Sequence, residues 1–421
     1  MTAVWFKRPI LAWALYDWAN SAFSLSVMTS FVPVLLAGFW SDGAESAVTT
    51  FRLGIANGLA SLIVAVSAPA IGAIADRAGR RKRGVLIFTA LGVVMTGAMY
   101  LVAAGEWGLG LACYVLASIG FAAGNSLYDS LLVDVASPDI YDRVSAYGFG
   151  LGYLGSALLF TVNVLIVGSP ERFGFASEAE AVRMTFLMVA VWWAVFTVPL
   201  VIWVHEPKSV PGTRGTIRAG FAELRATLRS IRTQRNLWLF LLAYWLYIDA
   251  VYTIIKMAVD FGLSQGLMMQ DLITAILVTN FVGFPAAIVF GYLGERFGAR
   301  RGIYLALGVY VLATSAAPFI DTAAEFYALA VTIGLVQGGV QSLSRSLFAR
   351  LVPEGKTGEY FGFYNMLGKF AAILGPVLAG VVALMTGSQR VGILSIIILL
   401  VGGLWLLRQV ELPDGARGES A

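Results

Sequence analysis

The sequence predicts an all-α polytopic membrane protein with about twelve transmembrane helices, arranged as two pseudo-symmetric six-helix halves. Three observations lead to this prediction: the composition, the spacing of the apolar stretches and an internal repeat. Hydrophobic residues make up 58% of the 421 residues and charged residues only 13%. Because soluble domains usually carry about a quarter charged residues, this composition indicates a chain that lies mostly in lipid.

The apolar stretches are long enough to cross a bilayer, which takes roughly 20 residues per helix. They form two groups of six on either side of a polar interval. We therefore expect a first half over residues 1–204, a linker over 205–236 and a second half over 237–421. The predicted spans are 10–37, 50–75, 84–104, 109–133, 144–168 and 185–204, then 237–260, 271–294, 302–320, 326–350, 360–386 and 389–408.

The basic residues predict the orientation, because cytoplasmic loops are enriched in Lys and Arg. If both termini are cytoplasmic, cytoplasmic segments hold 22 of the 29 basic residues and outer segments hold four. The remaining three basic residues fall inside predicted spans. We therefore expect the N and C termini to be cytoplasmic.

A motif after the second predicted span recurs in weaker form in the second half. The copies, displaced by 219 residues, are Gly72-x-x-x-Asp76-Arg77-x-Gly79-Arg80-Arg81-Lys82-Arg83 and Gly291-x-x-x-Glu295-Arg296-x-Gly298-x-Arg300-Arg301. The segment from Asn125 to Leu131 likewise matches the segment from Gln341 to Leu347, at an offset of 216. Two halves related by a pseudo-twofold axis along the membrane normal would give this pattern, with a binding site between them near mid-bilayer.

The linker contains a predicted basic amphipathic helix, with apolar and basic residues interleaved at helical spacing. The residues are Phe221, Leu224, Leu228 and Ile231, and Arg218, Arg225, Arg229 and Arg232. Such a helix can lie on the lipids of the anionic inner leaflet; the alternative is a solvated linker helix. We expect no nucleic-acid binding, because the same charges already serve the membrane topology.

Other residues exclude several classes of site. The apolar run from Ile10 to Phe39 is too long for a cleavable signal peptide, whose apolar core has about 7–15 residues, so we expect a retained first span.

The single cysteine, Cys113, excludes an internal disulfide, and the single histidine, His205, leaves no His-based metal cluster. The glycine-rich stretch from Gly148 to Gly155 lacks a preceding strand, so it indicates close helix packing rather than a nucleotide loop. We expect no metal and no cofactor.

The repeated motif resembles the signature loop of the major facilitator superfamily, between the second and third helices. Other segments are similar to the bacterial "unknown major facilitator" branch, namely Tyr16-Asp17-Trp18-Ala19-Asn20-Ser21-Ala22-Phe23, Gly339-x-Gln341-Ser342-Leu343-Ser344-Arg345-Ser346-Leu347-Phe348-Ala349-Arg350 and Phe361-Gly362-Phe363-Tyr364 through Gly368-Lys369-Phe370. That branch is related to the fungal vacuolar amino-acid effluxers linked to autophagy. The resemblance covers essentially the full chain and implies the fold, a transport role and, for a bacterial protein, the cytoplasmic (inner) membrane. At position 129 a neutral residue, commonly Asn, is expected in this branch, so Asp129 departs from its pattern.

Ionisable residues inside membrane spans are costly and usually functional. Asp17 and Asp249 occupy the helices that begin the two halves, and either could carry a proton across the membrane or contact the substrate. The alternative is a buried hydrogen-bond network that never titrates. Tyr16 and Trp18, beside Asp17, are further candidates for substrate contact. The neutral polar residues Asn20, Gln337 and Gln341 lie at depths that suit a cavity wall, although helix–helix hydrogen bonding explains them equally well.

Opposite charges at matching positions of the two halves predict an inner gate. Asp129 and Arg345 are related by the repeat, and Lys369 is expected at a similar depth. An ion pair here could close the inner mouth and break on opening; a static structural pair is the alternative. Lys256 is expected near the outer end of its span, where its amine could extend to the membrane surface.

The repeated motif itself is better explained as a conformational latch than as a binding site. Glycines at 72 and 79 allow close packing, and Asp76 can accept from a helix N-terminus or a basic side chain when the inner side is closed. The predicted latch comprises Gly72, Asp76, Arg77, Gly79, Arg80, Arg81, Glu295 and Arg296. The alternative is a purely topological role for the basic residues.

The leading functional hypothesis is a monomeric secondary transporter that works by alternating access and is proton-coupled, rather than an enzyme. A small polar or zwitterionic solute is the expected substrate, with amino acids suggested by the vacuolar relatives alone. An amphiphile such as a lipid or cell-wall fragment is the first alternative. A polytopic membrane enzyme and a non-transporting receptor or scaffold are the others.

Overall fold

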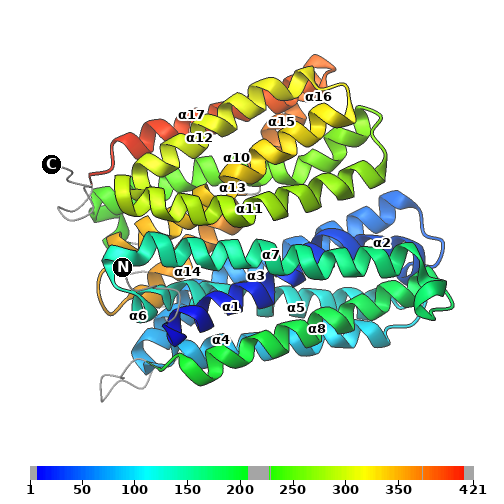
Figure 1. Ribbon diagram of the computed structural model, residues 1–421, viewed down its shortest axis with the longest axis horizontal. Helices are drawn as coiled ribbons and strands as arrows, with labels where there is room; N and C mark the ends of the chain where they lie inside the picture. Colours follow the sequence, from blue (N-terminus) through cyan, green and yellow to red (C-terminus); the bar gives the residue numbers. More distant parts are fainter. Residues whose placement is uncertain (1–6, 207–226, 228, 372, 412–421) are drawn as a thin grey trace.

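The computed structural model describes residues 7–206, 227, 229–371 and 373–411, and every regular element in these ranges is a helix. Twelve helices in these ranges are long and apolar enough to cross a membrane. They lie side by side in one bundle, and the first described helix begins at the end of the bundle where the last one finishes, which we call the terminal end (Figure 1). We call the opposite end the distal end.

The first six spans occupy the part of the chain before the linker. Their main helices are α1 (Arg8–Ala22), α3 (Ser46–Ala78), α4 (Arg81–Ala98), α5 (Trp107–Ser130), α7 (Tyr141–Gly168) and α8 (Glu178–Trp203). The first span continues beyond α1 through η2 (Phe23–Phe31), α2 (Val32–Leu35) and η3 (Leu36–Trp40). The short elements α6 (Leu132–Val135), η4 (Met99–Leu101), η5 (Pro138–Ile140) and η6 (Pro170–Phe173) complete this half.

The last six spans follow the linker. They are built from α10 (Arg235–Ser264), α11 (Met269–Phe297), α12 (Ala299–Ala316), η7 (Ala317–Phe319), α13 (Ala323–Leu351), α14 (Thr357–Phe370), α15 (Leu374–Thr386), α16 (Gln389–Ser395) and α17 (Ile397–Arg408). The twelve spans agree with the twelve predicted from the sequence, although most helices extend a few residues beyond the apolar stretches.

Two spans depart from regular α-helix. The segments η2 and η3 of the first span are π-helical, a rare form that often marks functional sites. The eleventh span breaks between α14 and α15, and Pro376 lies in the first turn of α15, where a missing N–H is tolerated. Both irregularities therefore lie in spans that line the centre of the bundle.

Two helix pairs make the most extensive contacts between the halves. Helix α7 packs along α11, which runs beside it at the boundary between the halves in Figure 1, and α3 packs along α14. Glycines make these contacts close: an added Cβ at Gly362 would lie 2.5 Å from the Cα of Pro69, and one at Gly291 would lie 2.6 Å from the Cβ of Ala146. The α3–α14 contact at Gly362 is therefore backbone against backbone, while the α7–α11 contact at Gly291 is backbone against the small side chain of Ala146.

The predicted amphipathic helix of the linker lies mostly outside the described residues. Phe221, Leu224, Leu228, Arg218 and Arg225 belong to this part. At the described end, residues 229–233 are helical, with Ile231 buried in the protein core and Arg229 and Arg232 exposed.

Candidate functional site

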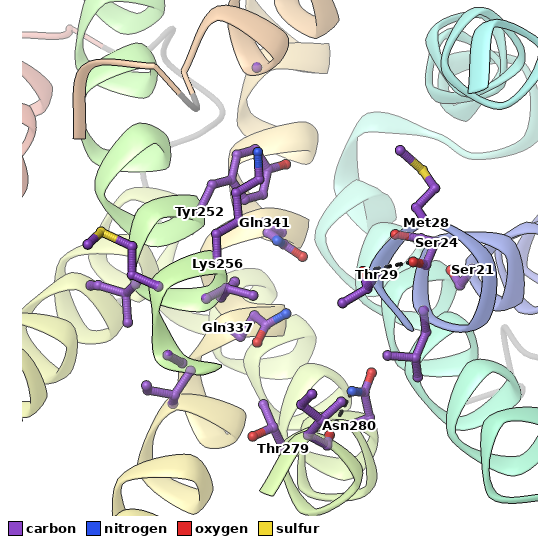
Figure 2. A pocket seen from close by; sticks show the side chains of 18 of the residues that line it. Ser21, Ser24, Met28, Thr29, Tyr252, Lys256, Thr279, Asn280, Gln337 and Gln341 are labelled. Atoms are coloured by element: carbon purple, nitrogen blue, oxygen red, sulfur yellow. Dashed lines mark hydrogen bonds between the residues drawn. The ribbon is translucent and has the colours of Figure 1, made fainter. Parts of the chain in front are cut away.

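A central cavity of about 1040 Å³ lies between the two halves. Helices α1, α3, α5 and α7 and segment η2 of the first half line it, together with α10, α11, α13 and α14 of the second. Figure 2 shows Lys256, Gln337 and Gln341 on one wall facing Ser24 and Thr29 on the other. The volume is just above the usual range of small-molecule sites, about 300–1,000 Å³.

Seven of the ten residues predicted for substrate binding, proton coupling and the inner gate line this cavity. They are Asp17, Asn20, Asp129, Gln337, Gln341, Arg345 and Lys369. On the first span, Asp17, Asn20, Ser21 and Ser24 face the cavity because residues three and four apart share one face of a helix. Two of the neutral residues already form hydrogen bonds: Asn20 donates to Oδ1 of Asn125, and the Tyr153 hydroxyl donates to Oε1 of Gln341 at 2.6 Å. Oε1 of Gln337 has no hydrogen-bond partner among the described residues.

Tyr16 and Trp18 are not among the lining residues, which corrects the placement expected for them. The Tyr16 hydroxyl bonds Oγ1 of Thr89 at 2.7 Å, and the Trp18 ring stacks on Trp192 at 5.5 Å between centroids. Successive residues of a helix point about 100° apart, so the neighbours of a cavity-facing aspartate point into the first half instead.

The Arg345 guanidinium joins the two halves at the wall of the cavity. Its Nη1 lies 2.8 Å from Oδ1 of Asp129 and 3.4 Å from Oδ2 of Asp17. Its Nε donates to the Ser145 hydroxyl at 2.9 Å, and its Nη2 donates to the Ser145 carbonyl at 2.9 Å. The predicted pairing of Asp129 with Arg345 is thus present and runs across the halves, with Asp17 as a further member that the sequence did not assign to it.

Aromatic rings and an amide complete the surroundings of this arginine, which is only 2% exposed. The guanidinium lies over the rings of Trp13 and Phe149 at 4.7 and 4.2 Å from their centroids. The amide of Asn365 donates to Oδ2 of Asp129 at 2.9 Å. One guanidinium therefore faces two carboxylates, and the cluster carries one excess negative charge when both are ionised. We call Asp17, Asp129 and Arg345 the arginine cluster.

Lys369 and Lys256 occupy positions that differ from the expectation. Lys369 lines the cavity but forms no ion pair with Asp129 in the described structure; its amine lies 5.9 Å from the Phe121 ring centroid. Lys256 also lines the cavity, as Figure 2 shows, so the expectation that its amine reaches the outer membrane surface is wrong.

Asp249 does not line the cavity and instead caps a broken helix. It is fully buried on α10, and its Oδ1 accepts the N–H of Gly375 at 3.0 Å and the Thr253 hydroxyl at 3.3 Å. Gly375 is the second residue of α15, whose N-terminal dipole favours a negative charge. The other carboxylate oxygen of Asp249, Oδ2, has no hydrogen-bond partner among the described residues.

The first copy of the repeated motif binds the second half. Asp76 accepts the N–H of Gly358 at 3.0 Å and the N–H of Glu359 at 2.9 Å, at the start of α14. Arg81 lies 3.5 Å from Asp76 and 3.0 Å from Asp134. Asp76 thus caps a helix N-terminus of the other half, which is one of the two interactions expected from the sequence. Gly79 ends α3 with a φ of 58°, a left-handed conformation that favours glycine.

The second copy makes a different contact with the first half. Glu295 forms a two-pronged ion pair with Arg143 at the start of α7, with 2.7 Å between Oε2 and Nε. The sequence did not single out a neighbouring cluster in which Arg350 binds Asp142 through both guanidinium nitrogens, at 2.7 and 3.0 Å, and Ser346 donates to Asp142. Arg296 takes no part in these contacts and lies over the Phe297 ring. Together these contacts close the terminal end of the cavity.

The sequence missed several members of the site, including Ser145, Asn365 and Asn125. Asn125 and Asn365 lie within segments that carried the repeat or the resemblance, and that position was the available signal. Which residue of one half faces which residue of the other depends on helix rotation, which the repeat does not specify.

Comparisons with known proteins agree on one class. The family model described as "Vacuole effluxer Atg22 like" matches residues 42–141 and 133–420. The chain is 38% identical to an uncharacterised MFS-type transporter, YxiO, of Bacillus subtilis (strain 168), over 96% of this chain and 94% of that protein. It is 22% identical to autophagy-related protein 22-1 of Penicillium rubens, over 98% of this chain and 91% of that protein. The solved human organic anion transporter MFSD10 matches in fold with a TM-score of 0.74 at 17% identity, over 95% of this chain and 99% of that one.

Proposed function

Because the chain belongs to the Atg22-like family of vacuole effluxers, within the major facilitator superfamily, it is a membrane transporter, and we propose that it moves a small polar or zwitterionic solute by alternating access. The central cavity carries this proposal, since it lies between two halves that meet through α3–α14 and α7–α11. Amino acids are the first candidates. The halves at 1–204 and 237–421 would rock about the cavity in a monomer, with 205–236 as the linker.

The arginine cluster supports proton coupling. Asp129 holds Arg345 at 2.8 Å, whereas Asp17 lies 3.4 Å from it, so Asp17 is the weaker partner and the one to take up a proton. A neutral Asp17 removes the excess negative charge and weakens the attraction between the halves. Release of Arg345 would then open the terminal end, which makes the cluster both the proton site and the inner gate.

The latch contacts support the closed state of the same end. The basic residues around Asp76 and Glu295 support a cytoplasmic position for this end under the positive-inside rule. We place the protein in a bacterial cytoplasmic membrane, with both termini inside. In this orientation the cavity, as the structure has it, is closed towards the cytoplasm.

Flux in proteoliposomes tests the proposal. A panel of labelled amino acids and other small solutes is offered with and without a pH gradient. Asp17→Asn should abolish accumulation driven by the gradient while exchange down a solute gradient persists. Asp260→Asn, an exposed change on α10 outside the cavity, is the matched control. Proton coupling is rejected if the wild-type flux ignores the gradient, or if Asp17→Asn accumulates solute normally.

An amphiphile is the alternative cargo, and the apolar part of the cavity wall favours it. Leu25, Met28, Leu62, Ile254 and Met257 line the same cavity as the polar groups. A lipid or cell-wall fragment could place its tail there. Movement of a labelled lipid between leaflets, without flux of any water-soluble solute, would select this alternative.

A further inference from the structure

Two lysines in the cavity lack an anionic partner. Lys256, on α10, and Lys369, on α14, both line the cavity. Within the described residues, neither forms an ion pair or hydrogen bond. Both lysines present their positive charge to the same cavity. The compensation that the described residues offer is limited to the Phe121 ring, 5.9 Å from the Lys369 amine, and to the more distant charge of Asp249 near Lys256.

The positions of the two lysines make this arrangement costly. Eight residues separate Lys256 from Ser264 at the end of α10, which is about 12 Å of helix. Lys369 precedes the break of the eleventh span and is half-buried. Charged residues at membrane depth normally pair with one another or face a water-filled cavity.

The acidic groups of the site are already engaged. Asp17 and Asp129 share Arg345, and Asn365 binds the second oxygen of Asp129. Asp249 attracts Lys256 from beyond ion-pair distance, but it is fully buried and caps α15. The charged residues that line the cavity, within the described chain, are thus three cations and two carboxylates.

We propose that Lys256 and Lys369 form a binding site for an anionic group of the transported solute, a carboxylate or a phosphate. Lysine ammonium groups bind such oxygens by charge-assisted hydrogen bonds. Gln337 and Gln341, beside Lys256 in Figure 2, offer neutral donors and acceptors for the rest of the solute. The inference rests on the proposed transport function and sharpens it, because it excludes solutes that carry no anionic group.

Binding to the purified full-length protein in nanodiscs tests this site directly. The probes are lactate, alanine, succinate and glycerol 3-phosphate, each compared at constant ionic strength with its uncharged or amidated counterpart (lactamide, alaninamide, succinamide and glycerol). We expect at least one anionic probe to raise the melting temperature while its counterpart does not. Preference for glycerol 3-phosphate identifies a phosphate, preference for lactate or succinate a carboxylate, and preference for alanine an amino acid.

Variants assign the binding to the two lysines. Lys256→Gln and Lys369→Gln should each weaken binding about 10- to 100-fold, the loss expected for one hydrogen bond to a charged group. Lys256→Arg and Lys369→Arg retain the charge and should keep most of the affinity, which separates lost binding from lost folding. Lys356→Gln is the matched control, because Lys356 directly precedes α14 and lies outside the cavity. This variant should bind the anionic probe as the wild type does.

Any one of three results overturns the inference: no anionic probe stabilises the wild-type protein, the uncharged or amidated counterparts bind equally well, or the glutamine variants bind the anionic probe normally. Proteoliposome flux separates this failure from failure of the transport function. Normal flux of a neutral solute through Lys256→Gln/Lys369→Gln would reject the anion site and keep transport. Lysine-dependent binding without any flux would keep the site and reject transport.

Discussion

Replacing Gly72 by alanine should force the two halves apart at the terminal end. Helices α3 and α14 touch backbone to backbone here, and a Cβ at position 72 would lie 2.1 Å from the carbonyl oxygen of Gly358 and 2.4 Å from its carbon. These are backbone atoms, so no side-chain rotation relieves the overlap. To restore the 3.4 Å of an ordinary contact, the helices must separate by about 1.3 Å.

This separation also breaks the latch. The hydrogen bonds from Gly358 and Glu359 to Asp76, now 3.0 and 2.9 Å long, would lengthen beyond 3.5 Å. A hydrogen bond to a charged group contributes about 1.5–3 kcal/mol, so the closed contact loses roughly 3–6 kcal/mol. Inverting a two-state population from 1:99 to 99:1 requires about 5.5 kcal/mol. We therefore expect Gly72→Ala to move much of the population to a form that is open at the terminal end.

Pulsed electron paramagnetic resonance between two spin labels measures this shift. Arg83 and Glu354 are exposed on the two sides of the latch and accept cysteine labels in a Cys113→Ala background. The Gly72→Ala variant should show a longer distance population than the wild type. Gly54→Ala is the matched control on the same helix, because a Cβ there meets nothing within 4 Å. An unchanged distance distribution in Gly72→Ala, or the same shift in Gly54→Ala, would refute the reasoning.

Three further changes test other contacts of the site. Arg345→Gln leaves two buried carboxylates unpaired and should destabilise the protein by about 3–5 kcal/mol. Adding Asp129→Asn should recover part of this loss, and thermal melts of the single and double variants measure both effects. Asp249→Asn weakens the cap on α15 and should cost about 1 kcal/mol, measured in the same melts; normal flux in this variant would exclude an essential protonation of Asp249. Glu295→Gln breaks a pair whose side chains are 19% and 31% exposed, so it should cost at most about 1 kcal/mol and shift spin-label distances less than Asp76→Asn does.

The fold was predictable from the sequence because the bilayer constrains it strongly. Each span must satisfy its own backbone hydrogen bonds, so apolar length alone identified all twelve helices. The repeat then divided them into halves, and the resemblance to the major facilitator superfamily is confirmed by the family model and the relatives. The π-helical part of the first span and the break before α15 escaped prediction. Both depend on how neighbouring spans pack, although Pro33 and Pro376 lie close to them.

The site was predictable in its members more than in their geometry. Charge at membrane depth singled out Asp17, Asp129 and Arg345, and the repeat suggested that the last two meet. Helix rotation decides the rest: Asp249 faces Gly375 rather than the cavity, while Lys256 faces the cavity rather than the membrane surface. One residue along a helix turns a side chain by about 100°, so sequence position alone cannot assign these faces.

The contacts between the halves follow a physical rule of duplicated folds. Residues at equivalent positions face each other across a pseudo-twofold axis, so an ionisable residue copied into both halves would meet its own charge at low dielectric, where repulsion is strong. Here the copies at an offset of 216 have diverged to opposite charges, Asp129 against Arg345, and the two residues meet directly. The two copies of the latch motif have also diverged in what they bind: Glu295 binds the side chain of Arg143, while Asp76 accepts the backbone N–H of Glu359. The α7–α11 contact therefore depends on a half-exposed ion pair that salt screens, whereas the α3–α14 contact uses a buried helix N-terminus. High salt should loosen the former first, so the two sides of the closed end open unequally.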